Sequence, residues 1–253
     1  MQRPAHLIPR MAWMAVLLLS CTPTPDACTD DNGAAALSTC LSPTQPDAYY
    51  ADQGTRYFDT LETDYDGESG PDYAEGVARW EWPPWLLLTG YGREDMELAD
   101  AIIRLLPTSV PTRDCRFFGV QPFARCRVDF RYEDHPDQGC PIYEEFTFND
   151  TGEITFIEAW SDQPGLRPSP DDDPWAEGPD AHRLSTRIPG LGSATGAIDL
   201  DSPAMAEAAA SDPDVADFVS RANDFYDAWL EAYADAGPEV FTEGCGWTTS
   251  ARR

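Results

Sequence analysis

Between residues 113 and 161, apolar and polar side chains alternate with the two-residue period of β-strands, and two groups of turn residues interrupt the alternation. In the second group, Asp150, Thr151 and Gly152 form a three-residue loop whose glycine suits the left-handed conformation that closes such a hairpin. The pattern therefore predicts two consecutive β-hairpins. Their strands are expected at about residues 113–119, 123–133, 141–149 and 154–161.

The loop also predicts a register for the second hairpin. If Asn149 pairs with Glu153, then Glu144 lies directly opposite Glu158, and alternate side chains share one face. Most side chains on that face are large and apolar, so the face is predicted to be buried. Carboxylates that are buried opposite each other repel, and burial raises their pKa. A slip of one residue would move each side chain to the other face. The predicted pairs are Ile142 with Trp160, Glu144 with Glu158, Phe146 with Phe156, and Phe148 with Ile154.

Helices are predicted on both sides of the hairpins. Before them, helical spacing and breakers indicate helices at about residues 46–63, 71–80 and 94–105. After them, a long amphipathic helix is expected, with Ser211 as its capping residue and Gly237 and Pro238 at its end. Helices followed by antiparallel hairpins indicate the α+β class, with N-terminal helices packed on an antiparallel sheet and a C-terminal helical extension.

Composition divides the chain into five parts. Residues 1–20 have the charge and apolar run of a targeting segment, and residues 21–44 have the composition of a flexible tether. Residues 45–162 form the predicted α+β domain. Residues 163–202 are rich in Pro, Gly and Asp and are predicted to be irregular chain that wraps a surface. Residues 203–253 form the C-terminal helical extension.

The targeting segment ends in Leu18, Leu19, Ser20 and Cys21. This sequence resembles the bacterial lipobox, in which the cysteine is acylated and becomes the new N-terminus. The resemblance implies lipidation of Cys21 and anchoring to a lipid bilayer in the bacterial cell envelope, with the outer membrane or cell surface favoured because Thr22 follows. An ordinary secretory signal and an internal hydrophobic run are the alternatives.

The charge of the chain limits its partners and its chemistry. The 253 residues carry a formal net charge of −28, which argues against nucleic acid as a partner. The sequence contains no lysine, which excludes lysine-based catalysis. It has no glycine-rich phosphate loop and no nucleophile elbow, and His135 and His182 alone cannot build a multi-histidine metal centre. We therefore expect neither a cofactor nor a metal.

The seven cysteines fit export to an oxidising compartment, because lipidation of Cys21 leaves an even number for disulfides. Cys115 and Cys126 flank the first hairpin as cross-strand neighbours, which predicts a bond between them. Other pairings stay open, and their spacing does not match a zinc site. The predicted set is Cys28–Cys40 in the N-terminal loop, Cys115–Cys126, and Cys140–Cys245 between the sheet and the C-terminal tail.

Residues 45–162 place helices before long hairpins, and the last hairpin runs from Phe146 to Asp162 with a conspicuous Trp160. This arrangement resembles the nuclear-transport-factor-2-like (SnoaL-like) superfamily. The resemblance implies a curved sheet that wraps around a helix as a cone and encloses an apolar pocket. Functions in that superfamily range from isomerases, dehydratases and cyclases to binding without catalysis. No catalytic set of the superfamily matches this chain.

Two functions follow from a pocket of this kind. The first is an anchored binding protein for a small apolar ligand or an envelope protein, with pocket candidates Tyr57, Phe146, Phe156 and Trp160. The second is an acid–base enzyme in which Glu144 and Glu158 share a proton. A structural envelope protein is a third alternative. An arginine partner or an exposed position for these carboxylates would favour the binding protein over the enzyme.

Overall fold

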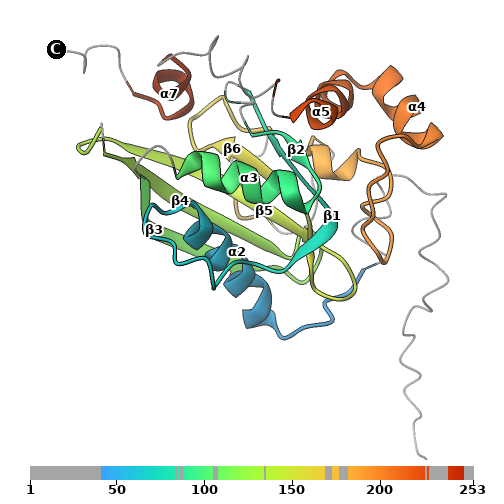
Figure 1. Cartoon of the computed structure of the whole chain (residues 1–253), viewed down its shortest axis with the longest axis horizontal. Helices are drawn as coiled ribbons and strands as arrows, with labels where there is room; N and C mark the ends of the chain where they lie inside the picture. The colour runs from blue at the N-terminus through green and yellow to red at the C-terminus, as the bar shows by residue number, and fades with distance from the viewer. Residues whose placement is uncertain are drawn as a thin grey trace, which may run out of the picture.

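The structure is a computed structural model, and it describes residues 41–83, 85, 88–104, 108–133, 135–168, 173–176, 182–225, 227 and 239–247. Within these residues the chain forms a six-stranded sheet with helices against it, which confirms the α+β class (Figure 1). The strands lie in the order β2-β1-β6-β5-β4-β3. Their bounds are β1 Tyr73–Glu81, β2 Gly90–Tyr91, β3 Thr108–Phe117, β4 Ala124–Tyr132, β5 Gly139–Phe148 and β6 Ile154–Ser161.

Strand β1 corrects two predictions. Residues 71–80 were expected to be helical, but Tyr73–Glu81 is a strand. The sheet was expected to be antiparallel, but β1 runs parallel to β6, so the sheet is mixed. The physical reason is that both faces of β1 are buried: Val77 lies in one core, and Ala78 and Trp80 lie in another. A strand buried on both faces loses the alternation that marks a half-buried one.

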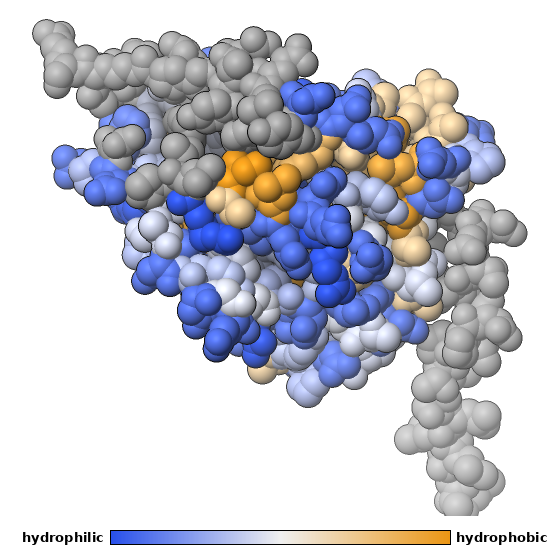
Figure 2. Space-filling model, in the orientation of Figure 1, coloured by the Kyte–Doolittle hydropathy of each residue, from blue (hydrophilic) through white to orange (hydrophobic). Residues whose placement is uncertain are grey.

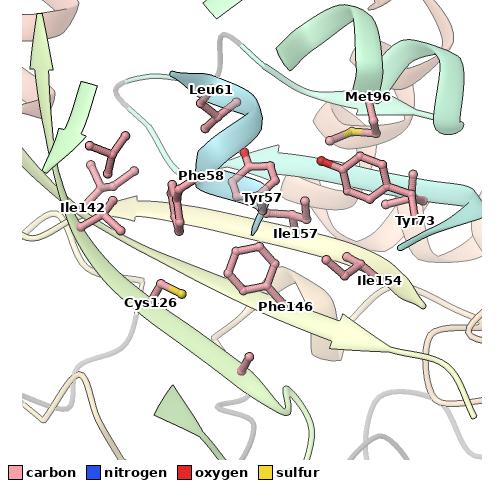
Figure 3. Packing of buried hydrophobic residues seen from close by; sticks show 14 of the residues in the cluster. Tyr57, Phe58, Leu61, Tyr73, Met96, Cys126, Ile142, Phe146, Ile154 and Ile157 are labelled. Atoms are coloured by element: carbon pink, nitrogen blue, oxygen red, sulfur yellow. The ribbon is translucent and has the colours of Figure 1, made fainter. Parts of the chain in front are cut away.

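Helices α2 (Asp47–Leu61) and α3 (Arg93–Ile103) confirm two of the predicted helices and lie in front of the sheet in Figure 1. Aromatic side chains join α2 to the sheet. The rings of Tyr57 and Phe58 approach Phe146 of β5 edge-on, with centroids 5.3 and 6.2 Å apart (Figure 3). This first core also contains Met96 of α3.

The opposite face of the sheet is covered by chain that follows β6. It includes the short helix η3 (Leu184–Thr186), α4 (Pro203–Ser211) and α5 (Pro213–Asn223). Phe218 of α5 packs on Phe156 of β6 with ring centroids 5.8 Å apart, and Leu184 and Leu191 complete this second core. The sheet is thus the middle of three layers.

The predicted long C-terminal helix is two helices where the structure describes it. Ser211 ends α4 and does not cap the next helix, because Asp212 takes that position and accepts the backbone N–H groups of Asp214 and Val215. The predicted end at Gly237 and Pro238 lies outside the described residues. A short helix, α7 (Glu239–Gly244), follows it.

The register of the β5–β6 hairpin is correct beside the loop and wrong beyond it. Phe148 pairs with Ile154 as predicted, but an irregularity between Thr147 and Phe148 shifts every later pair by one residue. Glu144 therefore lies opposite Ala159, and Glu158 lies opposite Glu145. Because neighbouring side chains on a strand point to opposite faces, the shift places Glu144 and Glu158 on different faces of the sheet.

Two of the predicted disulfides are confirmed: Cys115–Cys126 joins β3 to β4, and Cys140–Cys245 joins β5 to the chain after α7. Cys21, Cys28 and Cys40 lie outside the described residues.

Where the chain is described, none of its helices has both the length and the apolar composition needed to cross a bilayer. The face shown in Figure 2 is mostly hydrophilic, with apolar colour near α3, where Leu98 is 41% exposed.

Candidate functional site

Charged and hydroxyl side chains gather on the sheet face that α2 and α3 cover. None of them is more than 6% exposed, although ionised groups are rarely buried without a reason. We call this set the Arg79 cluster. Its members are Tyr57, Tyr73, Arg79, Glu81, Asp100 and Glu144.

The sheet register brings two carboxylates to either side of a small residue. Glu81 of β1 and Glu144 of β5 are both paired with Ala159 of β6, which lies between them. Because alanine has a short side chain, the guanidinium of Arg79 fits between the two carboxylates. Its Nη2 donates to Glu81 Oε1 at 2.9 Å and to Glu144 Oε1 at 3.2 Å, and its Nη1 donates to the hydroxyl of Tyr57.

Helix α3 adds a third carboxylate. Asp100 Oδ2 accepts hydrogen bonds from Thr60 Oγ1 at 2.9 Å and from the hydroxyl of Tyr73 at 3.1 Å. Arg104, which follows α3, donates to the carbonyl oxygen of Thr60. In Figure 3 the hydroxyl of Tyr73 on β1 is directed toward Tyr57 of α2. The cluster thus connects both helices to the sheet.

Three buried atoms of the cluster have no hydrogen-bond partner: Glu144 Oε2, Asp100 Oδ1 and Arg79 Nε. Each unsatisfied polar atom in a protein interior costs about 1–3 kcal/mol, and more when the group is charged. Buried polar groups in native proteins are nearly always satisfied, so these atoms call for an explanation, such as a catalytic role or a bound water, ion or ligand.

The electrostatics of the cluster reflect its burial. Burial raises the pKa of Glu144 from 4.5 to about 7; the Arg79 guanidinium opposes this rise, and the charge of Glu81 adds to it. Burial likewise raises the pKa of Asp100 from 3.8 to about 6, against the hydrogen bond from Thr60. These two carboxyl groups therefore keep a proton to a higher pH than exposed carboxyl groups do.

The opposite face of the sheet also buries carboxylates, but it satisfies one of them fully. Glu158 Oε1 accepts from the indole Nε1 of Trp82 at 2.6 Å and from the backbone N–H of Leu184 at 2.8 Å. Its Oε2 accepts from the backbone N–H of Ser185 at 3.0 Å. Burial raises the pKa of Glu158, and the facing charge of Glu145 adds to the rise. These contacts make Glu158 the attachment point of η3.

Glu145, beside it, is held by arginines. Arg125 places Nε at 2.7 Å and Nη2 at 2.6 Å from Glu145 Oε1, and Arg183 Nε lies 3.4 Å from Oε2. The guanidinium carbon of Arg183 lies 3.9 Å from the centre of the Trp160 ring. Several buried atoms here have no hydrogen-bond partner, namely the donors Arg183 Nε, Arg183 Nη1 and Trp160 Nε1 and the acceptor Glu145 Oε2, which only the 3.4 Å ion pair with Arg183 approaches. Positive and negative groups are balanced in number on this face.

The four pocket candidates do not lie together. Tyr57 and Phe146 lie in the first core, whereas Phe156 and Trp160 lie on the other face of the sheet, and each of the four is fully buried. Glu144 and Glu158 are likewise separated by the sheet, so they cannot share a proton. The irregularity beside Phe148 is the physical reason. It shifts the pairing of β6 with β5 by one residue, so the β6 side chains beyond it lie on the sheet face opposite to the predicted one.

Sequence reasoning missed Tyr73, Arg79 and Asp100. Arg79 lies in the stretch that the sequence predicts to be a helix, residues 71–80. That prediction gives no reason to place its side chain on a buried strand face. Asp100 lies in α3 among residues typical of a solvated helix face. A strand assignment for residues 73–81 would have revealed an arginine between two apolar neighbours, which is a sign of a buried charge.

Comparison with known proteins gives no family. No protein-family model matches the chain, and a search of curated proteins finds no match. The resemblance to the nuclear-transport-factor-2-like superfamily therefore stays a prediction. Within the described ranges, no three histidine, cysteine, aspartate or glutamate side chains are grouped so that they could hold a metal ion.

Proposed function

We propose that this protein is an exported, lipid-anchored binding protein that holds a small polar molecule in the Arg79 cluster. The observation that carries the proposal is the pair of buried carboxylate oxygens without partners, Glu144 Oε2 and Asp100 Oδ1. A bound molecule with hydrogen-bond donors would satisfy both oxygens and recover the free energy that their desolvation costs.

A ligand in the Arg79 cluster would be polar, whereas the sequence predicts an apolar one. The apolar pocket candidates Tyr57 and Phe146 pack against each other, so they offer a ligand little apolar surface. The hydroxyl of Tyr57 belongs to the Arg79 cluster and remains part of the proposed site. The cone-like shape and the superfamily resemblance belong to the same proposal, since α2 and α3 cover the sheet face on which a cone would hold its ligand.

Anchoring of Cys21 in the bacterial cell envelope is part of the proposal. The lipobox resemblance of Leu18 to Cys21 supports it, and two disulfides between cysteines far from that segment favour an oxidising compartment. The tether would then place the binding domain at the bilayer surface. The alternative to a small-molecule ligand is a protein partner in the envelope.

Native mass spectrometry of the full chain, purified in detergent from the envelope fraction of a bacterial host, tests the proposal. We expect a retained small molecule in addition to the mass of the acyl chains. Glu144→Gln should lose that molecule while keeping both disulfides. Glu75→Gln is the matched control, because this side chain is 96% exposed and makes only a distant ion pair with Arg93. A ligand-free mass for the unaltered protein would contradict the binding function.

An acid–base enzyme is a second candidate at the same site. The pKa of about 7 at Glu144 favours it, because a general base works best when its pKa is near the operating pH. The ion pair with Arg79 counts against it, because a paired carboxylate is a weaker base. If the retained molecule is a substrate, Glu144→Gln should abolish turnover and leave folding intact; unchanged turnover would remove this candidate.

A further inference from the structure

The proposed function does not specify the chemical class of the ligand. The charges and the unpartnered atoms of the Arg79 cluster indicate which class would bind. We infer that the bound molecule is a small organic amine, held as its ammonium ion between Glu144 and Asp100. This inference rests on the proposed function and specifies the molecule that the same site would take.

The first reason is charge. Three carboxylates lie in the cluster, at Glu81, Asp100 and Glu144, and two guanidiniums face them. Arg79 is buried among the carboxylates, whereas Arg104 is half-buried at the edge, where it also lies over the ring of Tyr65. Full ionisation would therefore leave one unbalanced negative charge inside the protein. A single positive charge on a ligand would balance it, and a neutral or anionic ligand would not.

The second reason is the type of the unpartnered atoms. Glu144 Oε2 and Asp100 Oδ1 are acceptors, so they need N–H or O–H donors from a ligand. The hydroxyl of Tyr73 already donates to Asp100 Oδ2, and the hydroxyl of Tyr57, which accepts from Arg79, is itself hydrogen-bonded to Glu144, so neither hydroxyl supplies the two oxygens that lack partners. A primary ammonium ion has three N–H donors, enough for both oxygens.

The third reason is the aromatic lining. The guanidinium carbon of Arg79 lies over the Tyr57 ring, 5.6 Å from its centre, so the cluster already holds one cation against an aromatic face. A cation over the face of an aromatic ring gains about 0.5–2 kcal/mol, with the larger values in desolvated sites. Arg79 contacts Oε1 of Glu81 and Oε1 of Glu144, so an ammonium group would bind the other oxygen of Glu144, Oε2, and leave the contacts of the guanidinium unchanged.

Binding of this kind is coupled to protons. The charged and titratable groups that face Glu144 are Tyr73, Arg79 and Glu81 from β1, Tyr57 from α2, Asp100 from α3 and Tyr132 from β4. An ammonium ion binds the ionised form of Glu144, so it must expel a proton below the pKa of about 7. Affinity should therefore fall by about tenfold for each pH unit below that pKa.

The test measures the thermal stability of the full chain in detergent with three chloride salts at equal ionic strength. Methylammonium has three N–H donors, tetramethylammonium has the same charge without donors, and sodium controls for salt. We expect methylammonium alone to raise the melting temperature, and the effect to be larger at pH 8 than at pH 6. Calorimetry in two buffers of different ionisation enthalpy should detect the released proton.

Two variants locate the effect. Glu144→Gln and Asp100→Asn should each remove the methylammonium effect, whereas Glu145→Gln should retain it. Glu145 is the matched control, because it is the next residue on β5 and is equally buried, but it lies on the other sheet face with Arg125. Equal melting temperatures in the three salts would overturn the inference. If native mass spectrometry then still shows a retained neutral or anionic molecule, the binding function survives and only the amine is wrong.

Discussion

Each face of the sheet buries a glutamate completely, and the two faces treat it differently. Glu158 receives three hydrogen bonds, from an indole and two backbone N–H groups, so both of its oxygens are satisfied. Glu144 receives Arg79 on one oxygen and leaves the other without a partner. Both carboxylates have a raised pKa for the same first reason, which is burial. Burial depth and a raised pKa therefore do not distinguish Glu144 from Glu158, whereas the number of their oxygens that have hydrogen-bond partners does.

The largest expected effect comes from removing Glu158, the carboxylate whose oxygens both have hydrogen-bond partners. Glu158→Ala leaves the donors of Trp82, Leu184 and Ser185 without an acceptor in the interior. Removing one side of a buried charged network costs about 3–5 kcal/mol, so we expect a loss of that size in the free energy of unfolding. Urea titration followed by tryptophan fluorescence measures it, and Glu75→Ala is the exposed control. A loss no larger than that of the control would show that η3 is not attached through Glu158.

The next effect concerns pH. The pKa of Glu144 is raised from 4.5 to about 7, so the folded state holds a proton that the unfolded state has already released. Stability should therefore fall as pH rises between these two values and stay level above them, by up to about 1.4 kcal/mol per pH unit. Because the raised pKa of Asp100, about 6, acts in the same direction at lower pH, Glu144→Gln should flatten the curve mainly between about pH 6 and pH 7. An identical slope in the variant would mean that another group carries the proton.

A smaller effect sharpens the comparison at neutral pH. Glu144→Gln removes a poorly satisfied charge while Arg79 keeps Glu81 as a partner at 2.9 Å. We expect the unfolding free energy to change by less than about 1 kcal/mol, in either direction, because the lost ion pair offsets the relieved desolvation. The same urea titration measures this change and compares it with the change caused by Glu158→Gln. A loss as large as that of Glu158→Ala would make Glu144 structural.

The smallest effect sets the scale for exposed charge. Arg56 and Asp52 form an ion pair of 2.7 Å on the solvent side of α2, with side chains 44% and 52% exposed. Pairs of this kind contribute about 0.3–0.5 kcal/mol. A double-mutant cycle with Arg56→Ala and Asp52→Ala should give a coupling energy in that range, and it should shrink in high salt.

Several elements were predictable because local rules decide them. The loop at Gly152 takes a positive φ of 91°, and the cross-strand pair Cys115–Cys126 follows from the spacing of the first hairpin. These features depend on residues close together in the chain. Helices α2 and α3 were found for the same reason, since their ends are marked by local breakers.

The rest depends on distant chain. β1 resembles a helix by composition because both of its faces are covered, one by α2 and α3 and the other by residues beyond Arg183. The irregularity at Thr147 has no local signature, yet it decides which glutamate joins Arg79. A site built from Arg79, Asp100 and Glu144 needs β1, α3 and β5 in place, so neither its members nor its charge could be predicted from any one segment.

The disulfide between Cys140 and Cys245 joins residues 105 positions apart in the sequence, and η3, α4 and α5, which cover the Glu158 face, lie inside the ring that it closes. A protease that cuts the chain between β6 and η3 would therefore produce two pieces that remain one molecule. If Cys21 carries the proposed lipid anchor, one anchor would retain both pieces. Reduction of this disulfide would then release the C-terminal piece.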